Sequence, residues 1–228
     1  MKKTSDMRIG QFLSHAGVCS RRASSTFLRE NEVIYQDERI TRPDIRVDLN
    51  GPDVIINGKK ITVKKREILL LNKPPGYVCT HKEQKNQKSF FRLLPPVYSS
   101  FFFAGRLDID SRGLMVLSND GQFIYELSHP SGEQKKIYHV HTSRPLASQE
   151  KNEIVKGFFI QGEFLKADQI EPLDMPSHYK FVLHHGKNRE IRRLLEKFSV
   201  ETLDLFRVQF ADFSVEGIQE GEYRSVDS

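Results

Sequence analysis

The sequence predicts an α+β protein in two parts, a small αβ module followed by a larger domain built on a mostly antiparallel sheet. Three observations lead to this prediction. Two short helices and a few small strands fit within residues 1–61, whereas short apolar runs separated by turn residues dominate the rest of the chain. The excess positive charge lies in the first part.

The first module begins with an amphipathic helix. Four apolar residues repeat at the spacing of one helical face: Ile9, Phe12, Leu13 and Ala16. Gly17 follows as the expected C-terminal cap, and Ser20 is a candidate cap for a second helix. Short strands are expected at 33–35 and 54–56, and the second of these leads into a turn at 57–58. We therefore predict one compact unit over residues 1–61.

The stretch 62–67 is charged and poor in core residues, so it is the predicted linker, and a second domain follows over 68–228. The first strand of this domain is a short, fully apolar run, 68–71. Further strands are expected at 77–80, 114–118, 137–142, 181–185 and 205–210. Helices are expected after the turn at 119–121 and over 189–198.

The distribution of charge separates the two parts. The net charge of the 228 residues is +5. Residues 1–67 contain 14 Lys and Arg against 9 Asp and Glu, while the remainder contains 21 of each kind. Such an asymmetry is typical of a polyanion-binding module joined to a nearly neutral domain.

Composition also bounds the setting in which the protein works. Cys19 and Cys79 lie far apart and form no metal-binding spacing, and no apolar run approaches the roughly 20 residues that cross a bilayer. We expect a cytoplasmic protein with two reduced thiols and no membrane contact.

The most informative segment is 105–114, which places charged residues between apolar runs. Arg106 and Asp108 stand two positions apart, and Asp110 follows. Charged side chains next to buried strands are costly unless they pair, bind a ligand or line a cleft. This segment is therefore the candidate active site.

The N-terminal module, with the stretches 8–13 and 16–22, resembles the RNA-binding fold named after ribosomal protein S-four. The resemblance implies that Arg8, Ser20, Arg21 and Arg22 bind RNA. Elementary physics agrees, because free N–H groups at a helix start with two arginines beside them favour a phosphate.

The second domain resembles the ribosomal RNA pseudouridine synthases of the RsuA/RluB family. Four segments carry the resemblance in the family's order: 72–80, 105–114, 136–140 and 186–193. The resemblance implies isomerisation of uridine to pseudouridine, in which a C–N glycosidic bond breaks, the base rotates and a C–C bond forms. It also implies that no cofactor or metal is required.

The resemblance assigns a role to each residue of the candidate site. Asp108 is expected to attack C1′ or to remove the C2′ proton, and the choice between these routes stays open. Tyr138 is expected to stack on the uracil, and Arg106 to support the flipped nucleotide. Arg192 is the expected ion-pair partner of Asp108, since a guanidinium stabilises an ionised carboxylate. Asp110 is expected only to stabilise a turn.

Helical spacing separates the basic residues of the last motif. Arg192 falls about 110° from the centre of the apolar face, so it could reach a cleft, whereas Arg189 and Arg193 should point outward. We expect these two arginines and Lys187 to contact RNA.

The target is expected to be structured ribosomal RNA, met during ribosome assembly by a monomeric enzyme. The motifs favour large-subunit 23S RNA over small-subunit 16S RNA. Two alternatives remain at this point: an RNA-binding assembly factor without catalysis, and a glycoside hydrolase with paired carboxylates. The basic module and the absence of tryptophan argue against the hydrolase.

Overall fold

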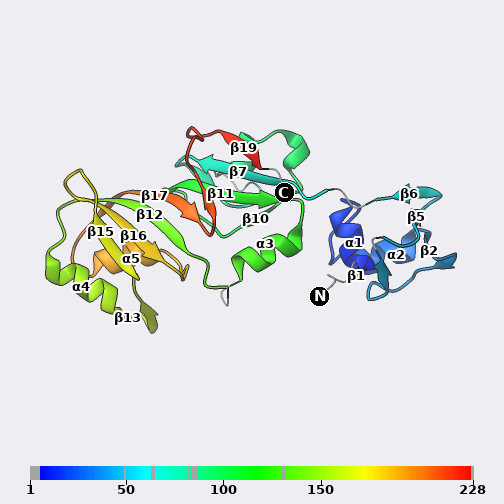
Figure 1. The fold of residues 1–228 in the computed structure, drawn as a ribbon, viewed down its shortest axis with the longest axis horizontal. Coiled ribbons are helices and arrows are strands. Elements are labelled where there is room, and N and C mark those ends of the chain that lie inside the picture. The colour runs from blue at the N-terminus through cyan, green and yellow to red at the C-terminus, as the bar shows by residue number, and fades with distance from the viewer. Residues whose placement is uncertain are drawn as a thin grey trace. The chain divides into compact units, whose positions relative to one another are not determined.

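The computed structural model describes residues 6–48, 50–62, 65–81, 83, 87–129 and 132–226. The chain forms two compact units, Met1–Arg66 and Glu67–Ser228 (Figure 1). Within the predicted linker, Val63 and Lys64 lie outside the described residues, and the others belong to no helix or strand. No helix in the described part of the chain is long and apolar enough to cross a membrane.

The first unit contains two helices, α1 (Ile9–His15) and α2 (Ser24–Glu30). Its six strands are β1 (Asp6–Arg8), β2 (Val33–Tyr35), β3 (Glu38–Arg39), β4 (Arg46–Asp48), β5 (Val54–Ile56) and β6 (Lys59–Ile61). One antiparallel sheet has the order β3-β2-β5-β6, and β1 pairs with β4. Apolar side chains from both helices and from β2, β4 and β5 form one core.

Local sequence signals explain most of this unit. Gly17 follows α1 with φ +73°, the left-handed conformation that a glycine adopts without strain after a helix. Asn57 and Gly58 both have positive φ and turn β5 into β6. Ser20 is a correction: its Oγ accepts a hydrogen bond from Ala23 N–H at 3.2 Å, so it caps a turn, and α2 begins only at Ser24.

The second unit is built on a nine-stranded sheet. The main strand order is β15-β16-β12-β17-β11-β7-β19, with β10 beside β11 and β18 beside β17. The bounds are β7 (Ile68–Lys73), β10 (Phe102–Ala104), β11 (Arg112–Ser118), β12 (Lys136–Thr142), β15 (Gln169–Pro172), β16 (His178–Leu183), β17 (Thr202–Phe210), β18 (Phe213–Ser214) and β19 (Tyr223–Val226). The predicted strands 68–71, 114–118, 137–142, 181–185 and 205–210 each lie largely or wholly within one of these.

Helices and two small sheets complete this unit. The helices are α3 (Gly121–Ser128), α4 (Ser148–Lys156) and α5 (Glu190–Glu196), with 3-10 turns at Phe90–Leu93 and Pro96–Tyr98. One small sheet pairs β8 (Tyr77–Val78) with β9 (Lys88–Ser89), and the other is the hairpin of β13 (Phe158–Ile160) and β14 (Glu163–Leu165). Asp120 caps α3 by accepting from the N–H groups of Gln122 and Phe123.

The centre of the large sheet is a seam between two antiparallel halves. β11 and β17 run parallel and are paired only at Arg112↔Phe206 and Gly113↔Arg207. A Cβ atom at position 113 would lie 2.3 Å from the carbonyl oxygen of Arg207, and Gly113 has φ +113°. Only glycine therefore permits this approach. The segment 105–111 enters the sheet at this seam, immediately before β11.

Candidate active site

A cleft of about 520 Å³ opens at the seam and gathers residues from five separate segments, three of which carry residues that the sequence singled out. Asp108 and Arg106 come from the segment before β11, and Tyr138 comes from β12. Lys187 and Arg189 come from the loop before α5. The structure thus brings together five of the residues that the sequence singled out, although up to 83 positions separate them along the chain.

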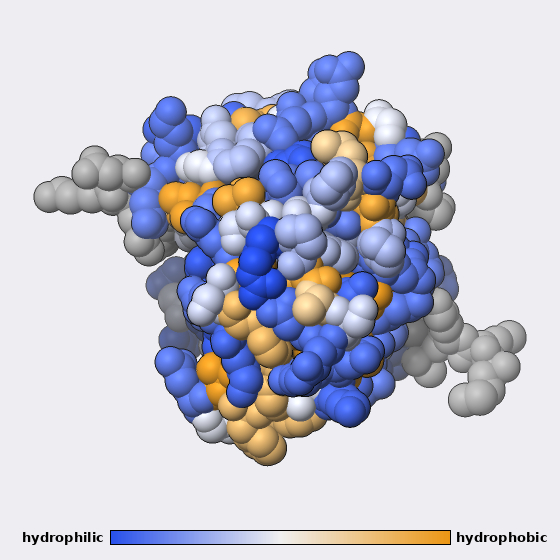
Figure 2. Space-filling view, turned by 90° about the vertical axis from the view of Figure 1, so that its left-hand side faces the viewer, coloured by the Kyte–Doolittle hydropathy of each residue, from blue (hydrophilic) through white to orange (hydrophobic). Residues whose placement is uncertain are grey.

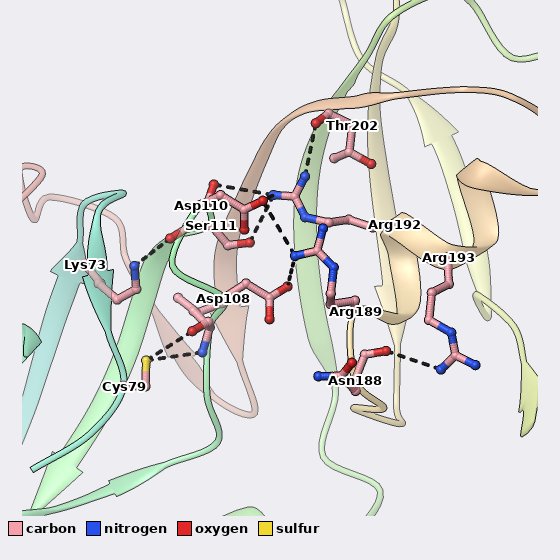
Figure 3. Close-up of polar contacts among 11 residues, drawn as sticks. Lys73, Cys79, Asp108, Asp110, Ser111, Asn188, Arg189, Arg192, Arg193 and Thr202 are labelled. Atoms are coloured by element: carbon pink, nitrogen blue, oxygen red, sulfur yellow. Dashed lines mark hydrogen bonds and ion pairs between the residues drawn. The ribbon is translucent and has the colours of Figure 1, made fainter. Parts of the chain in front are cut away.

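The loop that carries Asp108 is fixed on one side by the segment 72–79, from which Lys73 and Cys79 are drawn at the left of Figure 3. Gly76 N–H donates to the carbonyl of Ile109 at 2.7 Å, and Lys73 Nζ donates to the carbonyl of Ser111 at 2.7 Å. The Cys79 thiol donates to the carbonyl of Leu107 and accepts from its N–H, both at 3.3 Å. The proline- and glycine-containing motif therefore supports the active-site loop without lining most of the cleft.

Asp108 and Asp110 share one arginine, Arg189, and Asp110 has a second partner in Arg192. Arg189 Nη1 lies 3.5 Å from Asp108 Oδ2 and 3.6 Å from Asp110 Oδ2. Arg192 Nη2 lies 3.2 Å from Asp110 Oδ2. Arg192 is buried, and it also donates to the Thr202 carbonyl, the Ser111 hydroxyl and the Asp110 carbonyl (Figure 3).

This arrangement corrects the predictions that Arg192 pairs with Asp108 and that Arg189 points outward. The ion-pair partner of Asp108 is Arg189, and Arg192 is bound to Asp110. Two local features explain why Arg189, and not Arg192, is the partner of Asp108. Arg189 precedes the helix with left-handed backbone angles, φ 47° and ψ 35°, so it does not follow the helical spacing that would point it outward. Asp108 and Asp110 lie on a turn closed by Ser111 N–H to the Asp108 carbonyl at 3.1 Å, so they do not alternate as in a strand.

Arg193 does not point into solvent either. Its Nη1 lies 2.5 Å from Glu163 Oε2, and its Nη2 donates to the Ile160 carbonyl at 3.0 Å. Its side chain is only 15% exposed, so the expectation that it points outward is wrong, and its role in RNA binding stays a prediction. Lys187 lines the cleft, and its Nζ donates to the Phe164 carbonyl. The last motif is thereby joined to the β13–β14 hairpin.

Tyr138 and Arg106 are free to meet a ligand. Tyr138 follows an irregularity in the pairing of β12 with β17, a feature that re-aims side chains at functional sites. Its ring is partly buried between two hydrophobic clusters of the sheet. Arg106 is exposed and forms no ion pair with the residues that the structure describes. This argues against a merely structural role for Arg106.

Burial shifts the pKa values of two groups beneath the site. Lys73 is fully buried, which lowers its pKa from 10.5 to about 8. Its ammonium contacts carbonyl oxygens, of Pro74 and Ser111. Burial shifts the pKa of the Cys79 thiol in the other direction, upward, because it disfavours the charged thiolate. This thiol therefore keeps the proton that it donates to Leu107. Sequence reasoning assigned neither residue a contact, although a lysine directly after an apolar run was a visible signal.

Glu190 is a second buried carboxyl group at the edge of the cleft. Its Oε2 accepts from the N–H of Lys187 at 3.0 Å, which fixes the loop before α5. Its Oε1 is buried and has no hydrogen-bond partner among the described residues. Burial raises the pKa of this carboxyl group above 4.5. The sequence predicted no role for Glu190.

The four predicted RNA-binding residues of the first unit fall into two groups. Arg8 and Arg21 line a hollow of about 420 Å³ beside α1 and α2. Arg22 is exposed nearby in sequence, and Ser20 is exposed with its hydroxyl bound to Ala23 N–H. The hollow also includes Asp6 and Asp44, so its charge is mixed.

Comparisons with known proteins agree with this fold and cleft. The model of the RNA pseudouridylate synthase family matches residues 67–197. A Rickettsia bellii protein, named an uncharacterized RNA pseudouridine synthase, is 33% identical over 226 residues, which cover 96% of each chain. Ribosomal large subunit pseudouridine synthase B of Bacillus subtilis is 28% identical over 228 residues, covering 96% of this chain and 91% of the relative.

A solved structure shares the fold. The crystal structure of a pseudouridylate synthase matches with a TM-score of 0.68 and 23% identity, over 97% of this chain and 96% of the other. Fold and similarity together define an RNA-modifying isomerase. The chain belongs to the RNA pseudouridylate synthase family.

Proposed function

We propose that this protein isomerises a specific uridine of ribosomal RNA to pseudouridine, and that the uridine lies in the large-subunit 23S RNA. The observation that carries the proposal is the single cleft in which Asp108, Tyr138 and Arg106 meet. The similarity to a relative named for the large ribosomal subunit supports the choice of subunit. The small-subunit 16S RNA is the alternative target.

Asp108 is the carboxylate that starts the reaction. It attacks C1′ or removes the C2′ proton, either of which breaks the C1′–N1 bond. The released uracil rotates while it remains bound, C5 joins C1′, the C5 proton leaves and N1 gains a proton. In the first route the bond between Asp108 and C1′ breaks as C5 joins C1′; in the second the proton held by Asp108 returns to C2′. The reaction is an isomerisation, so no atom is gained or lost.

The other cleft residues hold the nucleotide. Tyr138 presents an aromatic face on which uracil can stack. Arg106 is unpaired within the described part of the chain and can support the extruded nucleotide. Arg189 holds Asp108, and Lys187 adds positive charge at the cleft for the RNA backbone.

The first unit is an S-four-type RNA-binding domain in this proposal, and Arg8, Arg21 and Arg22 contact phosphates. Its excess of positive charge supports this assignment. We further propose a cytoplasmic monomer that meets structured RNA during ribosome assembly; its two cysteines are free, as reduced thiols would be.

The substitution Asp108→Asn tests the proposal, because it removes the carboxylate charge with little change in shape. We expect no pseudouridine at the target uridine of 23S RNA, by chemical mapping, and unchanged RNA binding by filter retention. Mapping in cells with and without the gene identifies the uridine and the subunit. Turnover near the wild-type rate in the Asp108→Asn variant would contradict the role of Asp108. An RNA-binding assembly factor without catalysis would leave pseudouridine unchanged when the gene is removed.

A further inference from the structure

Two phenylalanines are exposed on the β13–β14 hairpin. Phe159 is 72% exposed and Phe164 is 41% exposed. The two residues face each other across the hairpin, and their rings meet edge to face with centroids 5.4 Å apart. On a two-stranded hairpin with one buried face, alternation places polar residues on the other face. A paired aromatic surface at these positions therefore has no explanation in the stability of the core.

The hairpin has its own buried face, so the exposed rings are not needed to anchor it. Leu165 is fully buried, and Phe158 and Ile160 pack against the core cluster of α4 and α5. Figure 2 views the side of the second unit that carries the hairpin and shows a hydrophobic patch at its lower edge, surrounded by hydrophilic side chains. The aromatic pair is thus a small apolar surface in a polar environment.

The position of the pair is fixed by Lys187, from the loop that lines the active-site cleft, and by Arg193 of α5. Arg193 binds the Glu163 carboxylate and the Ile160 carbonyl, and Lys187 binds the Phe164 carbonyl. The hairpin turn at 161–162 has positive φ at both residues, which favours a tight two-residue turn. The rings are therefore presented by a rigid element, joined by hydrogen bonds to the wall of the cleft.

We propose that Phe159 and Phe164 form a stacking platform for an unpaired base of the RNA strand that enters the cleft. The inference rests on the proposed action of this site on RNA. Charge complementarity favours this occupant, because Lys187 lines the cleft and also binds the carbonyl of Phe164, so a basic group that suits a phosphate backbone lies beside the hairpin. Any base presents a π-face, so the platform contributes affinity without choosing a sequence.

Binding of two fluorescent RNA probes tests the platform. One probe is a ten-residue oligoadenylate, and the other is the same ribose-phosphate chain without bases. We expect the full-length protein to prefer the oligoadenylate, and the double variant Phe159→Ala/Phe164→Ala to lose about tenfold of that preference. The salt dependence of binding should not change, because no charge is removed. An unchanged preference in the double variant would overturn the proposal.

Three variants separate stacking from general hydrophobicity and from loss of folding. The double variant to Tyr should restore the preference, whereas the double variant to Leu, which keeps apolar volume without a π-face, should not. Tyr125→Ala, which removes a 57% exposed aromatic residue of α3, is the matched control and should behave as wild type. Rescue by Leu would overturn the proposal in favour of general hydrophobic contact with the bases. A wild-type dimer that the alanine variant converts to monomer, by analytical ultracentrifugation, would overturn it in favour of a second copy.

Catalysis gives an independent measurement. On 23S RNA transcripts the alanine variant should raise KM about tenfold with little change in kcat, because the rings hold RNA and do not touch the reacting atoms. A lower kcat at unchanged KM would overturn the proposal. Absence of pseudouridine with the wild-type protein would instead contradict the proposed function, while the binding preference would still test the platform.

Discussion

Arg189 and Arg192 both contact the turn that carries Asp108 and Asp110, and their substitution by glutamine should damage the protein in different ways. Arg189→Gln removes the guanidinium whose Nη1 lies 3.5 Å from Asp108 Oδ2. At this distance, Coulomb's law gives about 1 kcal/mol in bulk water and about 5 kcal/mol at an effective dielectric constant of about 20. Because the side chains are 43% and 28% exposed, solvent reduces the interaction, and we take about 1–2 kcal/mol.

If that interaction positions Asp108 for reaction, Arg189→Gln should lower kcat about 5- to 30-fold. The free energy of unfolding should change little, since the side chain is nearly half exposed. Arg192→Gln should have the opposite effect: a fall in the free energy of unfolding with little change in kcat. It removes a buried guanidinium with three hydrogen bonds and the Asp110 ion pair, which we estimate at about 2–4 kcal/mol. The expected fall in Tm is about 4–16 °C.

The assay is single-turnover pseudouridine formation on a 23S transcript, with Tm measured on the same preparations. Arg192→Lys is the matched variant: it keeps the positive charge but loses the planar hydrogen bonding to Ser111 and Thr202. The reasoning is refuted if Arg192→Gln abolishes turnover at unchanged Tm while Arg189→Gln is silent. That outcome would mean that Arg192 pairs with Asp108 during the reaction, as the sequence motif alone suggested.

Three further predictions follow from buried or basic groups. Lys73→Met removes the hydrogen bond to the Ser111 carbonyl that helps to hold the Asp108 loop, so it should lower kcat at least tenfold. Because burial lowers the Lys73 pKa to about 8, the free energy of unfolding of the wild-type protein should rise from pH 8 to 10.5. This rise should be smaller in the Lys73→Met variant, as chemical denaturation can measure. Glu190→Gln should stabilise the protein by about 1 kcal/mol at neutral pH, because the fold disfavours the ionised carboxyl group. Protonated Glu190 is tolerated in the fold, so the stability of the wild-type protein falls as the pH rises above 4.5 and Glu190 ionises. The extra stability of the Gln variant should therefore disappear in thermal melts below pH 4.5. An equal gain in stability at neutral pH and below pH 4.5 would contradict this explanation. Arg21→Ala with Arg22→Ala should reduce the slope of log affinity against log salt by about 0.7–0.9 for each phosphate that the protein no longer neutralises, and an unchanged slope would remove the first unit as the RNA anchor.

Local signals were sufficient for much of the fold. Gly17, the turn at 57–58 and Asp120 each impose a backbone conformation through their own chemistry, and each marks an element boundary where expected. Apolar runs located the central strands because a buried strand has few alternatives. The resemblance placed Asp108, Tyr138 and Arg106 in one site, and these three line the cleft, as do Lys187 and Arg189, which were expected only to contact RNA.

The detailed partners could not be read from the sequence. Helical spacing assumed that α5 includes position 189, but the left-handed backbone of Arg189 redirects its side chain. The fate of Arg193 depended on a hairpin that the sequence did not predict, because its strands have only three residues each. Non-local packing decided both cases, and spacing along the chain carries no information about it.

The two-residue parallel pairing of β11 with β17 has a consequence for how the protein matures. Arg207 Nε binds the carbonyl of Leu114, 93 positions away in the chain, and contacts of such separation form slowly. Asp108 precedes β11, whereas Tyr138 lies on β12, which meets β11 only through β17. We therefore expect helices and hairpins to form before any catalytic cleft exists. A newly synthesised chain would acquire its activity late, in the step that pairs β11 with β17 and joins the two halves of the sheet.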